Sequence, residues 1–135
     1  MQERKVILAI DDMSMNLRTI KVLLEKHFDI RLAKSGQLGL TILGCEKISL
    51  ILLDIEMPGM SGFEFLDKMK NNAHVYDVPV IFISSHATPD LIKYASKYDG
   101  VKDYIIKPIT REILEKKVFA ALNIDPLTAY EYDDI

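Results

Sequence analysis

Three acidic residues, one serine and one lysine each follow directly after a short apolar run of the sequence. Asp11 and Asp12 follow VILAI, and Asp54 follows LILL. Ser84 follows VIFI, and Lys107 follows VKDYII. If these runs are parallel strands, the five side chains lie at the carboxyl edge of one sheet, where ligands bind in open α/β folds.

This set of side chains suits the transfer of a phosphoryl group. Three carboxylates in one place repel one another, and a hard divalent cation such as Mg²⁺ relieves that repulsion while it binds a phosphate oxygen. The lysine and the serine hydroxyl complete an electrophilic cradle for the phosphoryl group. One carboxylate could be the nucleophile and form an aspartyl phosphate, and Asp54, central in the predicted sheet, is best placed for it.

Each of these residues also has a structural explanation when it is taken alone. The two adjacent acids could cap a helix that begins near Ser14, and Asp54 could open the turn at Pro58-Gly59. A serine at a strand end usually bonds the backbone, and a lone lysine is usually solvated. We favour the shared site, because it explains with one cause why all of them fall at the same edge.

The elements that must position these residues alternate along the chain. Nearly unbroken apolar runs predict strands that are covered on both faces, as in a parallel sheet. The predicted strands are Val6–Ile10, Ile30–Ala33, Ile48–Leu53, Val80–Ile83 and Val101–Ile106. Apolar residues recur at helical spacing between strands, and five strands alternating with five helices predict a doubly wound α/β fold.

Several residues predict where helices begin and end. Ser61 with Glu64 three residues later forms a capping box. Thr88 precedes a proline, and Thr110 precedes the last helical stretch, so both are predicted N-caps. Gly100 is predicted to close the helix that begins near Thr88.

The composition indicates one cytoplasmic domain. The chain has 135 residues and a single cysteine, Cys45, which excludes an internal disulfide and which we expect to be buried. Residues 123–135 hold four of the 20 acidic and none of the 17 basic residues, so the remainder carries 17 basic and 16 acidic residues. We expect one domain over residues 1–122, an acidic tail or linker stump over 123–135, no membrane span and no direct contact with nucleic acid.

The sequence resembles the receiver domain of two-component response regulators over about residues 5–122. The resemblance rests on four motifs in a fixed order, LAIDD, LLDIEMPGMSGFEFL, PVIFISS and DYIIKP. It implies a flavodoxin-like fold, with parallel strands in the order 2-1-3-4-5 and helices on both faces. It also implies a signalling function in a two-component system or phosphorelay.

The resemblance assigns roles in phosphoryl transfer to the acidic residues. It implies that Asp54 accepts a phosphoryl group from a phosphohistidine of a histidine kinase or a histidine phosphotransfer protein. Asp12 and Asp54 match the side-chain ligands of Mg²⁺, and Asp11 holds the metal through water. The backbone carbonyl of Glu56 matches the third protein ligand.

Further residues match the positions that bind and respond to the phosphoryl group. Ser84 and Lys107 match the groups that bind phosphoryl oxygens, and the bond from Lys107 to the following proline is expected to be cis. Tyr104 matches an aromatic switch that alters the surface of the last two helices and the fifth strand. Glu56 and His86 flank the path of an attacking water and are expected to tune dephosphorylation.

Two other functions remain open at this point. A Mg²⁺-dependent phosphohydrolase like the haloacid dehalogenases also forms an aspartyl phosphate, but that family has a second aspartate where this sequence has Glu56. A degenerate receiver could bind partners without phosphorylation. We expect no enzymatic turnover beyond self-assisted phosphorylation and dephosphorylation. The sequence leaves open the effector, a homodimer, and whether the chain stands alone or is part of a longer regulator.

Overall fold

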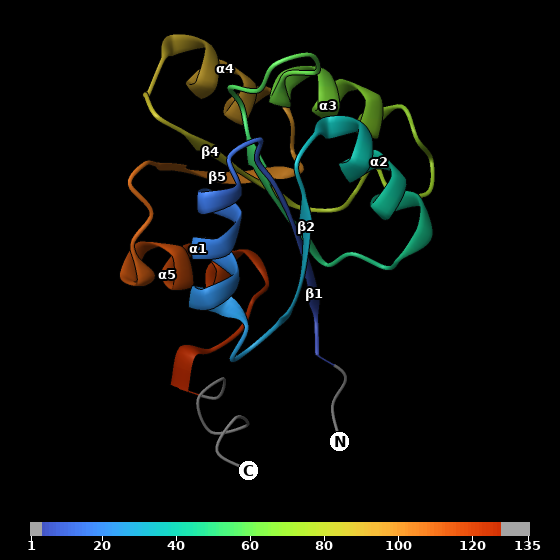
Figure 1. The fold of residues 1–135 in the computed structure, drawn as a ribbon. Helices are drawn as coiled ribbons and strands as arrows, with labels where there is room; N and C mark the ends of the chain where they lie inside the picture. The colour runs from blue at the N-terminus through green and yellow to red at the C-terminus, as the bar shows by residue number, and fades with distance from the viewer. Residues whose placement is uncertain (1–3, 128–135) are drawn as a thin grey trace.

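The computed structural model describes residues 4–127, in which five strands alternate with five helices (Figure 1). The strands are β1 (Val6–Ile10), β2 (Asp29–Ala33), β3 (Leu50–Asp54), β4 (Val80–Ser84) and β5 (Val101–Ile106). The helices are α1 (Ser14–Leu24), α2 (Gly36–Cys45), α3 (Gly62–Lys70), α4 (Pro89–Lys97) and α5 (Arg111–Ala121). All strand pairs are parallel in the order β2-β1-β3-β4-β5, which confirms the predicted doubly wound fold.

The sheet separates two hydrophobic cores. Alternate residues of each central strand enter opposite cores, as Leu8 and Ile7 of β1 do. One core packs against α2, α3 and α4, and the other packs against α1 and α5, which lie together in Figure 1. Because both faces are covered, β3 and β4 are buried along their whole length, which explains their unbroken apolar sequences. None of the helices in the described part of the chain has the length and apolar character needed to cross a membrane.

The predicted helix caps are present. The Ser61 hydroxyl accepts a hydrogen bond from the backbone N–H of Glu64 at 3.1 Å, and the Thr88 hydroxyl accepts one from Leu91 at 3.1 Å. Thr110 caps α5 in the same way. These caps start α3, α4 and α5 immediately after the loops that carry the candidate site.

Two predictions about single residues are wrong. Gly100 does not close α4, because the helix ends at Lys97 with Tyr98 as its C-cap, and Gly100 instead accepts a hydrogen bond from the N–H of Val80 at its carbonyl. Cys45 is exposed rather than buried. It is the last residue of α2 and lies two positions after buried Leu43, a spacing that places it on the solvent side of the helix.

The end of α5 turns back onto the core. Asn123 has a φ of 56°, and its N–H donates to the carbonyl of Ala120, while the N–H of Ile124 donates to the carbonyl of Phe119. This pair of bonds is a Schellman motif, and it places Ile124 against the core shared by α1 and α5. Residues 128–135, which hold most of the expected acidic tail, lie outside the described residues.

Gly62 sets the distance between the end of β3 and the start of α3. A Cβ atom at this position would lie 2.6 Å from the carbonyl oxygen of Asp54 and 2.7 Å from the Cα of Ile55. Both neighbours are backbone atoms, so neither can turn aside. Glycine is therefore required for α3 to begin against the strand that ends in Asp54.

Substitution of Gly62 by alanine is expected to destabilise the protein by about 2 kcal/mol or more, because the methyl group overlaps the backbone of β3. Urea unfolding measures this change in the free energy of unfolding. The control is Gly44→Ala in α2, where a Cβ atom would meet nothing within 4 Å. That change should be neutral or stabilise the helix by up to about 1 kcal/mol, and equal effects of the two substitutions would contradict this account.

Candidate functional site

The strand ends bring the predicted acidic residues and the lysine to one edge of the sheet. Asp11 directly follows β1, and Asp54 is the last residue of β3. Their side chains are almost fully buried, with only 1% and 2% of each residue exposed, and Asp12 beside them is half-buried. Lys107 directly follows β5 and reaches the same place.

The ammonium group of Lys107 pairs with two buried carboxylates. Lys107 Nζ lies 3.3 Å from Oδ2 of Asp11 and 3.5 Å from Oδ1 of Asp54. Asp12 adds a third carboxylate, and one oxygen from each acid lies within 4.8 Å of the others. Three negative charges against one positive charge leave an excess of negative charge in a largely buried place.

This donor set fits a hard divalent cation. All the donor atoms of the three acids are oxygens, which Mg²⁺ and Ca²⁺ prefer, whereas Zn²⁺ favours nitrogen and sulfur ligands. Because negative charge exceeds positive charge here, a cation is attracted to the cluster. A balanced ion pair would not attract one. The acidic cluster of Asp11, Asp12 and Asp54 can therefore hold a metal ion.

Asp11 also organises the start of α1. Its Oδ1 accepts a hydrogen bond from the N–H of Met13 at 2.8 Å, and its Oδ2 accepts one from Nδ2 of Asn16 at 3.1 Å. Met13 is the N-cap of α1 and has no side-chain capping bond of its own. The structural explanation for Asp11 and its place in the charged cluster are thus both correct. Sequence reasoning missed Asn16, whose only signal was a polar residue in the first turn of that helix.

The environment of Asp54 changes its acidity. Burial, together with the negative charge of Asp11, raises the pKa of this carboxyl from 3.8 to about 6. Lys107 and the N–H of Glu56, which donates to Oδ1 of Asp54 at 3.3 Å, act against this rise in pKa. Asp54 is therefore mostly ionised at neutral pH, yet it is a more basic carboxylate than an exposed aspartate.

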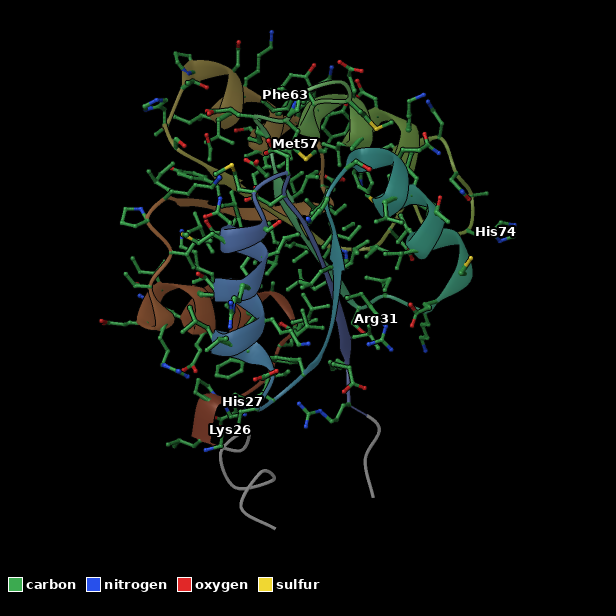
Figure 2. All side chains as sticks on the ribbon, in the orientation of Figure 1. Lys26, His27, Arg31, Met57, Phe63 and His74 are labelled. Atoms are coloured by element: carbon green, nitrogen blue, oxygen red, sulfur yellow. The ribbon has the colours of Figure 1, made fainter. Side chains whose placement is uncertain are left out.

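Core packing anchors the loop between β3 and α3 that carries Glu56. Met57 is buried in the core of α2, α3 and α4, and Phe63 at the start of α3 meets the ring of Phe82 edge-on at 5.7 Å between centroids (Figure 2). The N–H of Gly62 donates to the carbonyl of Ile55 at 3.0 Å. These contacts pack the loop against the core next to Asp54.

Ser84 is the last residue of β4, and its hydroxyl is hydrogen-bonded to residues of two neighbouring loops. Its Oγ lies 2.9 Å from the carbonyl of His86 and 3.2 Å from Oε1 of Glu56, and it accepts a bond from the N–H of His86. A hydroxyl has one hydrogen, so the carbonyl and the carboxylate compete for it. Glu56 and His86 are both exposed, and both meet at Ser84, His86 through its backbone.

Tyr104 lies in β5, three residues before Lys107 of the charged cluster. It pairs in register with Phe82 and packs half-buried against the core of α2, α3 and α4. Ser84 lies two residues after Phe82, so Ser84 and Tyr104 share one face of the sheet. The Lys107-Pro108 bond is cis, as predicted.

Comparisons of the sequence with known proteins identify its family. The family model of the response regulator receiver domain matches residues 7–119. Protein PilH of Pseudomonas aeruginosa is 32% identical over 117 residues, which cover 86% of this chain and 96% of PilH. A probable cyclic di-GMP phosphodiesterase of Vibrio cholerae is 35% identical over 116 residues, but the matched region spans only 26% of that protein.

Solved structures agree with the sequence matches. A response regulator receiver domain from Clostridium thermocellum is 33% identical and superposes with a TM-score of 0.77, over 88% of this chain and 94% of that one. The chemotaxis protein CheY4 of Vibrio cholerae superposes with a TM-score of 0.83, over 89% of this chain and all of CheY4. At 21% identity, CheY4 shows that the fold is the same.

The raised pKa of Asp54 predicts that Asp54→Asn is more stable than the wild-type protein at neutral pH in EDTA. Between pH 3.8 and about 6 the native state binds more protons than the unfolded state, so wild-type stability falls as the pH rises through this window. Asparagine has no charge to bury and escapes this loss.

With allowance for solvent screening, we expect the gap in free energy of unfolding to grow from roughly zero near about pH 4 to about 1–2 kcal/mol near about pH 7.5. Urea unfolding of both proteins at the two pH values measures it. The same gap at both values would show that Asp54 ionises as an exposed carboxyl does.

Proposed function

The chain belongs to the response regulator receiver domain family, and we propose that its phosphoacceptor is Asp54. The observation that carries this assignment is the position of Asp54, which is buried at the end of β3 with the Lys107 ammonium 3.5 Å from its Oδ1. The carboxylate is thus held by the backbone of a central strand and faces the cation that a phosphoryl group needs. The phosphoryl donor is a phosphohistidine of a histidine kinase or a histidine phosphotransfer protein.

In the proposed transfer, a carboxylate oxygen of Asp54 attacks the phosphorus of the phosphohistidine. The new O–P bond forms as the P–N bond breaks, and the partner's imidazole nitrogen keeps the electron pair and takes up a proton from solvent. Lys107 can then pair with a phosphoryl oxygen, and it keeps its contact with Asp11 in the meantime. The raised pKa of Asp54 makes its carboxylate a better nucleophile than an exposed one.

The metal in this proposal is Mg²⁺. Asp12, Asp54 and the backbone carbonyl of Glu56 would hold it, with Asp11 acting through water. When bound, Mg²⁺ neutralises charge on the carboxylates and on the phosphoryl oxygens. The excess of negative charge in the cluster supports this assignment.

Phosphorylation is proposed to act on the surface through Ser84 and Tyr104. To donate to a phosphoryl oxygen, the Ser84 hydroxyl must release the carbonyl of His86 and the carboxylate of Glu56. The loop after β4 then moves, and Tyr104 on the same face of the sheet turns inward. The surface of α4, β5 and α5 changes as a result and controls an effector domain or partner.

Glu56 and His86 are proposed to tune the lifetime of the phosphoryl group. Both are exposed, and both meet at Ser84, next to the path that an attacking water would take. The domain acts as a switch that turns over only its own phosphoryl group. A phosphohydrolase is not favoured, because the family match and Glu56 two residues after Asp54 both fit a receiver.

We predict that acetyl phosphate with Mg²⁺ adds one phosphoryl group to the wild-type protein and none to Asp54→Asn. Intact mass over time measures the gain and the later decay of the adduct. Asp67→Asn in α3 is a control that leaves the cluster untouched and should be phosphorylated as the wild type is. If acetyl phosphate adds no phosphoryl group and beryllium fluoride does not bind in the presence of Mg²⁺, the chain is a binding module that works without phosphorylation.

Removal of divalent cations is predicted to destabilise the wild-type protein. At a tenfold excess of Mg²⁺ over its Kd, the gain of about 1.4 kcal/mol corresponds to a rise in Tm of about 3–6 °C over the value in EDTA. Asp12→Asn should lose most of this rise, because it removes one carboxylate ligand. Asp90→Asn in the first turn of α4 is the matched control and should keep it, and an equal rise in all three proteins would point to a metal site elsewhere.

A further inference from the structure

The edge strand β5 exposes backbone groups that no other strand can bind. Within residues 4–127 its one neighbour in the sheet is β4, so the groups that face away from β4 need other partners. At Tyr104, both the backbone N–H and the backbone carbonyl have such a partner. The N–H donates to Oδ1 of Asp103 at 2.7 Å, and the carbonyl accepts from Nζ of Lys117 at 2.6 Å.

Lys117 of α5 makes two further contacts at the same place. Its Nζ lies 2.9 Å from Oδ1 of Asp103 and 5.3 Å from the centroid of the Tyr104 ring. One ammonium group therefore binds the carbonyl of Tyr104, faces its ring and pairs with the carboxylate that binds its N–H. We refer to Asp103, Tyr104 and Lys117 as the edge clamp.

The edge clamp joins the two faces of the sheet. Val118, next to Lys117 in α5, is buried in the core shared with α1, whereas Tyr104 packs against the core of α2, α3 and α4. Lys117 thus reaches around the edge strand to meet Tyr104. The register between β4 and β5 shifts between Val80 and Ile81, and a bulge of this kind turns the residues that follow it.

We propose that Lys117 is a positioning residue that holds the ring of Tyr104 in the orientation it has without phosphorylation. This inference rests on the proposed function, in which the ring turns inward after phosphorylation. A ring that turns inward leaves the Lys117 ammonium, and the favourable contact between the cation and the ring is lost. The bond to the carbonyl of Tyr104 and the pair with Asp103 keep the ammonium in place, so the ring is the part that moves.

Thermodynamic linkage connects the edge clamp to Asp54. A contact that favours the present orientation of the ring must weaken the binding of any group that favours the inward orientation, by up to the same factor. Lys117 therefore lowers the affinity of the site for a phosphoryl group without touching it. Its contacts with Asp103 and Tyr104 keep the unphosphorylated protein in the off state.

The test compares four proteins: the wild type, Lys117→Met, Lys117→Arg and Lys116→Met. Methionine keeps the length of the side chain without its charge, and arginine restores the charge. Lys116 is the exposed neighbour in α5 and serves as the matched control. Each protein carries 3-fluorotyrosine, with the Tyr104 resonance assigned by Tyr104→Phe, and each is titrated with beryllium fluoride in the presence of Mg²⁺.

We expect Lys117→Met to bind beryllium fluoride about threefold to tenfold more tightly than the wild type, as expected when one contact of this strength is lost. Before any beryllium fluoride is added, its Tyr104 resonance should already be shifted toward the position seen in the saturated wild type. Lys117→Arg should return both values toward those of the wild type, and Lys116→Met should change neither. Asp103→Asn removes the ion pair of Lys117 but keeps its ammonium group, and it should shift the affinity and the Tyr104 resonance in the same direction as Lys117→Met does. This variant replaces Lys117→Met in the test if Lys117→Met does not fold.

Two outcomes overturn the inference, and they are distinguishable. If the wild type binds beryllium fluoride but Lys117→Met matches it in affinity and in the Tyr104 resonance, Lys117 does not position the ring and the proposed function stands. If the wild type shows no Mg²⁺-dependent binding at all, the proposed function fails and the inference fails with it.

Discussion

The structure depends on two carboxylates buried at the end of the sheet beside a single ammonium group. Lys107 lies within 3.5 Å of both Asp11 and Asp54, and its positive charge offsets part of the repulsion between the two carboxylates. Even so, burial keeps the pKa of Asp54 at about 6. The remaining negative charge attracts a cation to this edge of the sheet. A bound cation in turn would favour a phosphoryl group there. The buried charge thus lowers the stability of this edge of the sheet and, at the same time, makes Asp54 more basic than an exposed aspartate.

The parallel sheet makes this arrangement possible. Strands that run in the same direction bring the residues at or just after the ends of β1, β3 and β5 to one edge, although these residues lie far apart in the chain. Close backbone contact at Gly62 and the buried side chain of Met57 then hold the loop after β3. Asp54 lies at the end of a buried strand, whereas the Ser84 hydroxyl has two competing acceptors.

Sequence reasoning predicted most of the fold and the residues of the cluster. Unbroken apolar runs are typical of covered parallel strands, and the hydroxyl residues three positions before Glu64 and Leu91 are helix caps as predicted. It failed where a residue's place depends on which way a helix faces or on where a helix ends. Cys45 falls on the outer side of α2, and Gly100 follows a helix that had already ended.

The order of residue types along this chain determined its fold class and the identity of the acidic cluster, because these follow from local periodicity and from strand ends. Its four motifs determined the resemblance to its family. The tertiary structure alone decided that one lysine pairs with both buried acids, that Glu56 competes for the Ser84 hydroxyl, and that Lys117 reaches around β5 to Tyr104. Those contacts join residues from different elements. Their distances depend on how the elements pack, and no pattern along the chain encodes such distances.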